Sequence, residues 1–358
     1  MTSASKNKKG RFLPSTFDSA HDLCFVIHDV MAQIIVSGEE GNFFTTEIKF
    51  NSDEEHKSLE DADDIFSWLE KENRINDRAS ILKATVLPAV LSDMMHCVFE
   101  CLESSRKAKL GISFMLIRKP LQESLYLLES IVLDELNFSE TLAADPLKLR
   151  SQNAGGVSGH AKRIQKVLDI IGESSRLDAE YIAQLRYDKN NDDSFDGVCN
   201  HAMHLFTEHK AIRTERLNIN FIFSGWSQKI TQWSYLYSRL PYLLFYTHKI
   251  VEYIVASIAP TSQDYLDDIQ RRISSSVMLW WRNVDDCYKC EKLSLFVKAT
   301  ERWLNSHCIS SGYRLPNDSD LLRMTTTGAY PSENITSLKK RNLKYKLHAF
   351  INKIMAKH

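Results

Sequence analysis

Apolar residues recur at helical spacing along most of the chain, and this pattern predicts a protein built from helices. The strongest signal covers residues 79–136, where one apolar stripe occupies 79–102 and a second occupies 114–132. A short polar break at 104–111 separates the two stripes. We therefore expect two long antiparallel helices packed face to face, which is the start of a helical bundle. Pro88 predicts a bend in the first of these helices, or its beginning.

Other segments carry the same spacing over shorter or longer stretches. The pattern predicts helices at residues 18–36, 161–172, 178–187, 196–210, 229–258, 264–282 and 291–306. Pro241 is expected to kink the aromatic helix 229–258. Residues 42–51 and 218–224 alternate well enough for a short strand or an extended segment.

Breaks in the pattern divide the chain into three parts. Residues 1–16 are polar and basic and are interpreted as a flexible arm, residues 17–260 as the core of the bundle. Residues 261–358 are interpreted as a smaller helical region with a CxxC turn and a basic terminal helix. Small and polar residues at 151–160 predict a linker within the core. Twelve glycines and eight prolines in 358 residues are few, which favours an all-α fold over a β-sandwich.

Charge and hydropathy restrict the class of protein. The net charge of −1 excludes a generally basic coat for nucleic acid, although not a local basic patch. The basic N-terminus has no apolar stretch behind it, and charged or polar groups interrupt the apolar residues 240–259. We therefore expect neither a secretory signal nor a membrane span. Seven cysteines, an odd number, are expected to be free thiols in the cytoplasm.

A CxxC turn, Cys287-Tyr-Lys-Cys290, is the one sequence feature typical of a metal site. Two thiolates at this spacing suit a tetrahedral zinc ion, and His307 or Cys308 would be the nearest further ligand along the chain. The competing interpretation is a helix-connecting turn with two free cysteines. Apart from this possible zinc, we expect no cofactor, because no phosphate-binding or dinucleotide-binding glycine loop occurs.

Two groups of polar residues lie in otherwise apolar helical patterns. Asn200 and His204 are four residues apart, a spacing that places them on one face of the expected helix. Such a group can bind phosphate or perform acid–base chemistry, because imidazole titrates near neutral pH. Arg118 and Glu123 lie in the second long apolar helix, where a buried charge needs a partner. They form either a structural ion pair or one wall of a polar pocket facing the helix of His204.

The same two segments, LIRKPLQESLYLLESIV and VCNHAMHLF, resemble helices of bacterial all-helical families grouped with HEPN-like (higher eukaryotes and prokaryotes nucleotide-binding) and abortive-infection proteins. The resemblance covers residues 80–215. It implies a helical bundle, often a homodimer, with a role in phage defence, stress or RNA metabolism. Carried over residue by residue, it points to Arg118, Glu123, Asn200 and His204 as catalytic residues of a metal-independent ribonuclease.

The Arg-x4–6-His spacing of these ribonucleases occurs at Arg302/His307 and Arg341/His348. About two such pairs are expected by chance in a chain with this many arginines and histidines, so the spacing alone identifies no site.

The C-terminal residues 335–358 contain seven lysines and arginines, no acid and an apolar stripe. A basic amphipathic helix can contact nucleic acid, an anionic membrane or an acidic protein. We expect an RNA contact to use the residues Lys339, Lys340, Arg341, Lys344 and Lys346. The resulting hypothesis is an HEPN-like protein that binds or cleaves RNA. The alternative is a non-enzymatic helical adaptor that binds a partner protein or nucleic acid through this helix.

Overall fold

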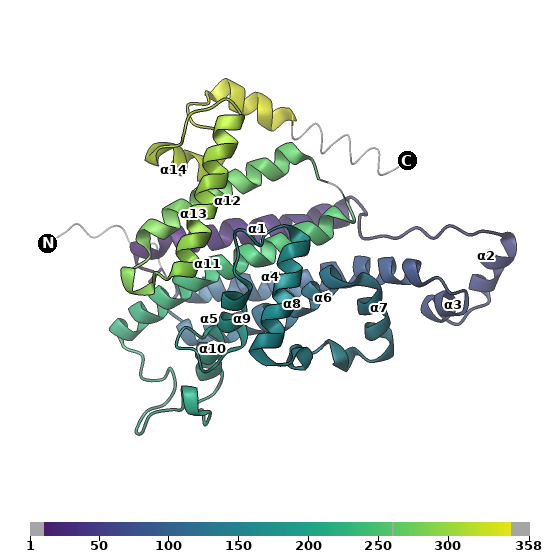
Figure 1. The fold of residues 1–358 in the computed structure, drawn as a ribbon, viewed down its shortest axis with the longest axis horizontal. Coiled ribbons are helices and arrows are strands. Elements are labelled where there is room, and N and C mark those ends of the chain that lie inside the picture. The colour runs from purple at the N-terminus through teal and green to yellow at the C-terminus, as the bar shows by residue number, and fades with distance from the viewer. Residues whose placement is uncertain (1–10, 260, 345–358) are drawn as a thin grey trace.

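The computed structural model describes residues 11–259 and 261–344, and within these ranges helices form all the regular secondary structure. Most of the helices pack around one core of buried apolar side chains. Figure 1 shows how the helices are arranged. The prediction of an all-α helical bundle is confirmed.

The two long apolar helices form the expected hairpin. Helix α4 (Ile75–Arg106) packs against α5 (Leu110–Lys119), and the chain continues through a π-helical turn, η2 (Pro120–Ser124), into α6 (Leu125–Leu133). Ala108 adopts a left-handed conformation between α4 and α5, which reverses the chain within three residues. The hairpin turns at the predicted polar break because no apolar face has to be interrupted there.

Two further helices complete the centre of the bundle. Helix α1 (Asp18–Glu40) packs against α4 and against α11 (Trp226–Ala256), which runs through Pro241 without interruption. Helix α11 is buried for most of its length because its bulky apolar and aromatic side chains cover nearly the whole circumference. It therefore lies in the middle of the bundle rather than at its surface.

Shorter helices surround this centre. Helices α2 (Asp53–Glu60) and α3 (Ile65–Lys71) lie in a stretch of the chain rich in acidic residues, 53–72. They are found at one end of the molecule (Figure 1). On the other side of the hairpin lie α7 (Glu135–Ala144), η3 (Pro146–Leu149), η4 (Ser151–Ala154), α8 (Gly156–Ile171), α9 (Ala179–Tyr187), α10 (Phe195–Met203) and η5 (Lys210–Ile212). Helices α8 and α9 pack together, while α10 packs against α5.

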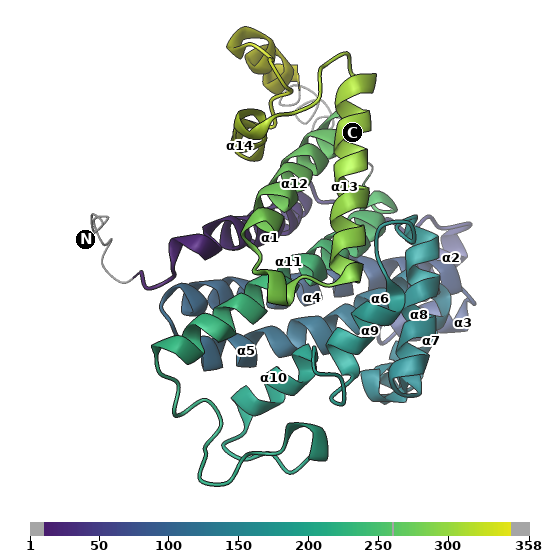
Figure 2. The same ribbon diagram turned by 60° about the vertical axis from the view of Figure 1, so that its left-hand side comes forward.

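The C-terminal region is also helical. It consists of α12 (Gln263–Asn283), η6 (Asp286–Tyr288), α13 (Glu291–Ser310), α14 (Asp318–Thr327) and a helix whose described part covers residues 335–344. Helix α12 packs against α1 as well as against α13 and α14. Figure 2 shows α12 and α13 rising from the bundle with α14 at their far end. The C-terminal region thus shares an interface with the first helix of the core.

Several local expectations differ from the structure. The predicted linker 151–160 is replaced by η4 and the first turn of α8, and the segments 42–51 and 218–224 are not strands. The predicted helix 196–210 ends at Met203. Within the predicted arm 1–16, residues 11–16 are described: Leu13 is buried, and its backbone N–H donates to the Arg106 carbonyl at 3.2 Å. Length and polarity predicted these segments less well than the long helices because they lack a sustained apolar period.

Two helical segments, Ser15–Glu40 and Ile75–Arg106, are long and apolar enough to cross a membrane. The sequence analysis had weighed only residues 240–259. The buried share of the most apolar window is 39% in the first segment and 33% in the second. Both segments contribute core residues such as Ile27 and Val98, and core helices of soluble proteins meet the same criteria. The absence of a membrane span stays a prediction.

Three buried histidines make the free energy of unfolding depend on pH. Burial lowers the pKa of His21, His160 and His248 from 6.5 to about 4 in each case, since the low-dielectric core disfavours the imidazolium. Neighbouring arginines lower the pKa further at His21 and His160. Between pH 6.5 and 4 the unfolded chain therefore binds protons that the folded chain does not. Stability falls as the pH falls through this window.

We expect His160→Phe to flatten this pH dependence. The His160 ring stacks on Tyr187 with 3.4 Å between centroids, and a phenyl ring can keep that contact while it removes the titrating group. The difference in unfolding free energy between pH 7 and pH 4.5 should shrink by up to about 3 kcal/mol. Urea unfolding at a series of pH values measures it. The exposed His209→Phe is the control, and an equal slope in the wild type and His160→Phe would contradict the assignment.

Candidate functional site

The predicted site is organised by the π-helical turn η2 (Pro120–Ser124). Pro120 has no N–H, and the N–H of Leu125 donates to the carbonyl of Pro120, five residues back. The carbonyls of Leu121 and Gln122 accept bonds from α9 instead. Arg186 Nε donates to Leu121 O at 2.5 Å, and the Tyr187 hydroxyl donates to Gln122 O at 2.9 Å. The irregular turn thus binds a neighbouring helix through its backbone.

A fully buried ion pair lies one turn of α6 further on. Arg186 donates to Glu129 Oε1 at 2.5 Å, and the Tyr246 hydroxyl donates to the same oxygen at 2.9 Å. Arg163 Nε lies 3.6 Å from Glu129 Oε2. Burial opposes the charge on Arg186, but the Glu129 carboxylate raises its pKa. Both side chains are inaccessible to solvent, so the pair is a structural element.

The buried carboxylate of Asp196, at the start of α10, connects two of the predicted residues, Asn200 and Arg118. Asn200 Nδ2 donates to Asp196 Oδ1 at 2.7 Å, and Arg118 Nε lies 3.8 Å from the same oxygen. Gln122, from the π-helical turn, also donates to this carboxylate, at 2.5 Å. Arg118 lies 4.0 Å from Glu123, the ion pair weighed from the sequence. The Arg118 guanidinium is therefore shared between two carboxylates.

Asp196 was not singled out from the sequence, where it is only the first residue of the predicted helix 196–210. Its spacing of four residues from Asn200 was the available signal, since such residues meet on one helical face.

His204 does not share a helical face with Asn200, which corrects the expectation. Helix α10 ends at Met203, and His204 caps it in an extended conformation with φ −121° and ψ 137°. The Asn220 side chain donates to the His204 carbonyl at 3.0 Å, a bond that replaces the next helical one. The His204 N–H still donates to Asn200 O at 3.1 Å, so the residue lies directly after Asn200's turn. Its side chain is exposed.

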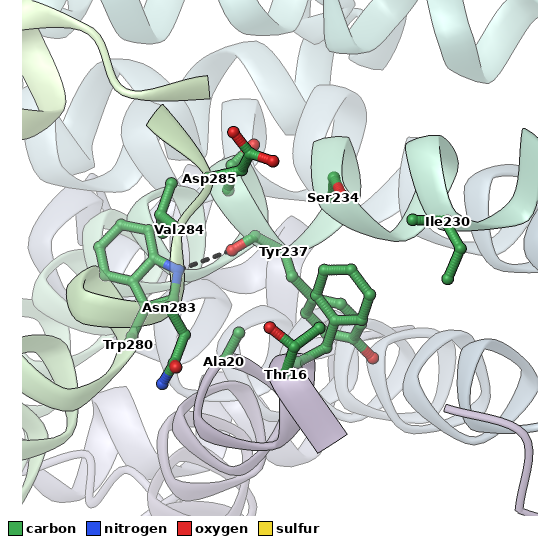
Figure 3. A pocket seen from close by; sticks show the side chains of 11 residues that line it. Thr16, Ala20, Ile230, Ser234, Tyr237, Trp280, Asn283, Val284 and Asp285 are labelled. Carbon is green, nitrogen blue, oxygen red and sulfur yellow. Dashed lines mark hydrogen bonds between the residues drawn. The ribbon is translucent and has the colours of Figure 1, made fainter. Parts of the chain in front are cut away.

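Two cavities lie on the bundle, one beside the π-helical turn and one between α1, α11 and α12. The larger, 680 Å³, borders Glu123, Ser124 and the ion pair of Lys119 Nζ with Asp93 Oδ2 at 2.8 Å. The smaller, 150 Å³, lies between α1, α11 and α12 (Figure 3). Across it Trp280 Nε1 donates to the Tyr237 carbonyl at 2.7 Å.

The two cysteines of the CxxC turn are free. Cys287 is exposed in η6, where its bond to Asp285 raises the pKa of the thiol, and Cys290 caps α13. His307 and Cys308 lie near the other end of α13, about 25 Å away at the rise of an α-helix. They do not complete a site with Cys287 and Cys290. Among the described residues, no three His, Cys, Asp or Glu side chains gather as a metal site; zinc stays a prediction.

The basic C-terminal segment is attached to the body by Arg341. Its guanidinium bonds Asp268 at 2.5 Å and Glu333 at 2.9 Å. The predicted RNA contacts Lys339, Lys340 and Lys344 are exposed, and Lys344 lies 2.7 Å from Asp264. Lys346 lies outside the described residues.

A cavity of 360 Å³ lies between this segment and α12. Four basic side chains and two acidic ones line it, together with Tyr330 and Ser337: Arg271, Lys340, Arg341, Lys344, Asp264 and Asp267.

The pair Arg302/His307 is not formed as the Arg-x4–6-His spacing would require. His307 contacts the buried Arg271 at 3.1 Å and the Tyr330 hydroxyl at 3.0 Å, whereas Arg302 is exposed. Burial, followed by the Arg271 charge, lowers the pKa of His307. His348 lies outside the described residues.

Comparisons of the chain with protein-family models, with characterised proteins and with solved structures give no match.

We expect Arg186→Met to lower the unfolding free energy by about 3–5 kcal/mol, because it leaves the Glu129 carboxylate buried without its main partner. Glu129→Leu/Arg186→Met should recover part of this loss, since the unpaired charge is then gone. Urea denaturation measures both variants. The exposed Arg302→Met is the matched control and should change stability by less than about 0.5 kcal/mol. A loss for Arg186→Met as small as the control's would contradict a structural role.

Proposed function

We propose that the protein binds RNA through its basic C-terminal segment. The observation that carries the proposal is that one basic residue of 335–344 attaches the helix to the body while the lysines are exposed. Arg341 holds the helix against α12 and Glu333, while Lys339, Lys340 and Lys344 are exposed. A helix held in place with the ammonium groups of Lys339 and Lys340 in solvent, and with Lys344 exposed beside Asp264, suits contact with a phosphate backbone, which releases counterions when lysines bind it.

Two further features support this proposal. Lys340 and Lys344 are four residues apart in a helix, so their side chains share a face. Both line the 360 Å³ cavity, where Arg271 and Arg341 add guanidinium groups. The cavity's two aspartates weaken the local positive potential, so RNA rather than a small anion is the favoured ligand, because a polymer can contact the exposed lysines as well.

Lys339→Gln/Lys340→Gln/Lys344→Gln tests the binding. We expect at least ten-fold weaker binding of a single-stranded RNA oligonucleotide, measured by fluorescence anisotropy at 100 mM salt. The slope of log K against log salt should fall in magnitude by about 2, since each lost phosphate contact on a single strand removes about 0.7. Arg341 is left in place because it anchors the helix.

The matched control removes three exposed lysines from other helices, Lys57→Gln/Lys71→Gln/Lys166→Gln. It changes the net charge equally and should keep wild-type affinity and slope. Equal weakening in both triple variants would show that only net charge matters and would contradict a site in the C-terminal segment.

We also propose that Arg118, Asn200 and His204 form the place where bound RNA is cleaved without a metal ion. Support comes from the chain of contacts Arg118–Asp196–Asn200 and from His204, which follows Asn200 by one turn and is exposed. An imidazole can take the proton from an attacking hydroxyl, and a guanidinium can balance charge on the phosphate. Glu123, 4.0 Å from Arg118, would orient that guanidinium.

RNA integrity after incubation with total cellular RNA tests the cleavage. We expect cleavage by the wild type and by His209→Ala, an exposed histidine of the same segment, but not by His204→Ala. Cleavage by all three proteins would contradict the role of His204. Intact RNA with all three would contradict the cleavage proposal and leave the binding proposal to its own test.

A further inference from the structure

The segment 203–226, between α10 and α11, projects from the bundle and exposes bulky apolar side chains. It hangs below the body in Figures 1 and 2. Six of its side chains are more than half exposed: Leu205, Phe206, Leu217, Ile222, Phe223 and Trp226. Leu217 is completely exposed. Isolated exposed apolar residues are normal on a protein surface, but a cluster of this kind marks an interaction site.

The polar side chains of this segment bond to the segment itself. Thr214 Oγ1 accepts from the Thr207 N–H at 2.7 Å, and Thr214 Oγ1 donates to Asn220 Oδ1 at 3.0 Å. The Asn220 side chain donates to the His204 carbonyl at 3.0 Å. These bonds give the segment a defined shape, and its bulky apolar side chains are exposed. A surface loop ordinarily exposes mainly polar side chains.

The six exposed apolar side chains are called the patch. The N–H of Asn220 donates to the Leu205 carbonyl at 3.1 Å, so the chain at residue 205 lies beside the chain at residue 220. Phe221 packs on Phe114 with 5.8 Å between ring centroids and holds the segment against α5. Phe221 and Leu217 have φ of +59° and +61°, values that bulky residues rarely adopt. Such strain persists where the exposed arrangement has a use.

Exposed cations accompany the patch. Lys210, Arg213 and Arg216 are exposed, against the two exposed acids Glu208 and Glu215. We propose that this segment docks on an anionic lipid bilayer, with the apolar side chains among the acyl chains and the cations at the headgroups. Trp, Phe and Leu beside Lys and Arg are the composition of membrane-interface segments. This inference stands independently of RNA binding.

A lipid surface fits the patch better than RNA does. Leu205, Leu217 and Ile222 are aliphatic and offer no ring for base stacking, which is the main apolar contact with single strands. A projecting, irregular set of side chains also suits fluid acyl chains, which adapt to its shape.

The test is co-sedimentation with vesicles of phosphatidylcholine containing 30% phosphatidylglycerol. The tail lysines could also bind such vesicles, so every protein carries Lys339→Gln/Lys340→Gln/Lys344→Gln. In this background we expect binding to the vesicles and at least a ten-fold loss on adding Phe206→Ser/Phe223→Ser. Adding Leu295→Ser/Ile309→Ser, two equally exposed apolar residues on α13, should leave binding unchanged. Circular dichroism and thermal unfolding confirm that each variant is folded.

Three results would overturn the inference: no binding by the folded background protein, equal binding by Phe206→Ser/Phe223→Ser, or equal loss in the α13 variant. Weaker RNA binding by Phe206→Ser/Phe223→Ser without any vesicle binding would also overturn it and identify the patch as an RNA surface. A pull-down of a second tagged copy that depends on Phe206 and Phe223, again without vesicle binding, would overturn it in favour of self-association.

Discussion

A carboxylate without access to water has to be paired, and Glu129 meets this constraint with Arg186. The two residues come from α6 and α9, and Tyr246 of α11 adds a third helix to the same oxygen. Because Arg186 also donates to the Leu121 carbonyl, the pair fixes the π-helical turn as well as the helices. That turn aims Gln122 at Asp196, which holds the α10 residue Asn200 and lies beside Arg118. The geometry of the proposed cleavage site thus depends on one buried pair.

The C-terminal region repeats this solution with different residues. Asp268 of α12 accepts bonds from Arg271, Arg272 and Arg341, and Arg341 comes from the basic terminal segment. A side chain at Gly328 would place its Cβ 2.2 Å from the Asp268 carboxylate, so only glycine allows this close approach. Arg341 therefore holds the basic segment through its charge. Of the apolar side chains in the described part of this segment, Ile335 and Leu343 are exposed and Leu338 is half-buried.

The regular parts of the fold were predictable from the sequence because burial imposes a period on it. The hairpin of α4 with α5, and α11 with its apolar circumference, follow directly from that period. The end of α10 was not predictable. The side chain of Asn220, sixteen residues away, donates a hydrogen bond to the His204 carbonyl, and nothing in the sequence near His204 indicates this contact. Arg118, Glu123 and Asn200 were singled out by the sequence analysis and lie near one another, whereas their common partner Asp196 was missed. His307 met Arg271 instead of Arg302 for the same reason: contacts between distant segments leave no spacing in the sequence.

The π-helical turn has a consequence for how this chain tolerates length changes. A π-helical turn holds one residue more than the α-helical turn it replaces. Loss of a single residue from 120–124 would restore an unbroken α-helix, and local helix stability would favour it. The α-helical turn so formed would still complete about one revolution, so Glu129 would keep its face toward Arg186. If the same residues formed an α-helix without a deletion, everything after them would rotate by about 100° about the helix axis, and Glu129 would face away from Arg186. The π-helical turn therefore absorbs one residue and keeps the two halves of the helix in register, so the loss of one residue there is better tolerated than the gain of one.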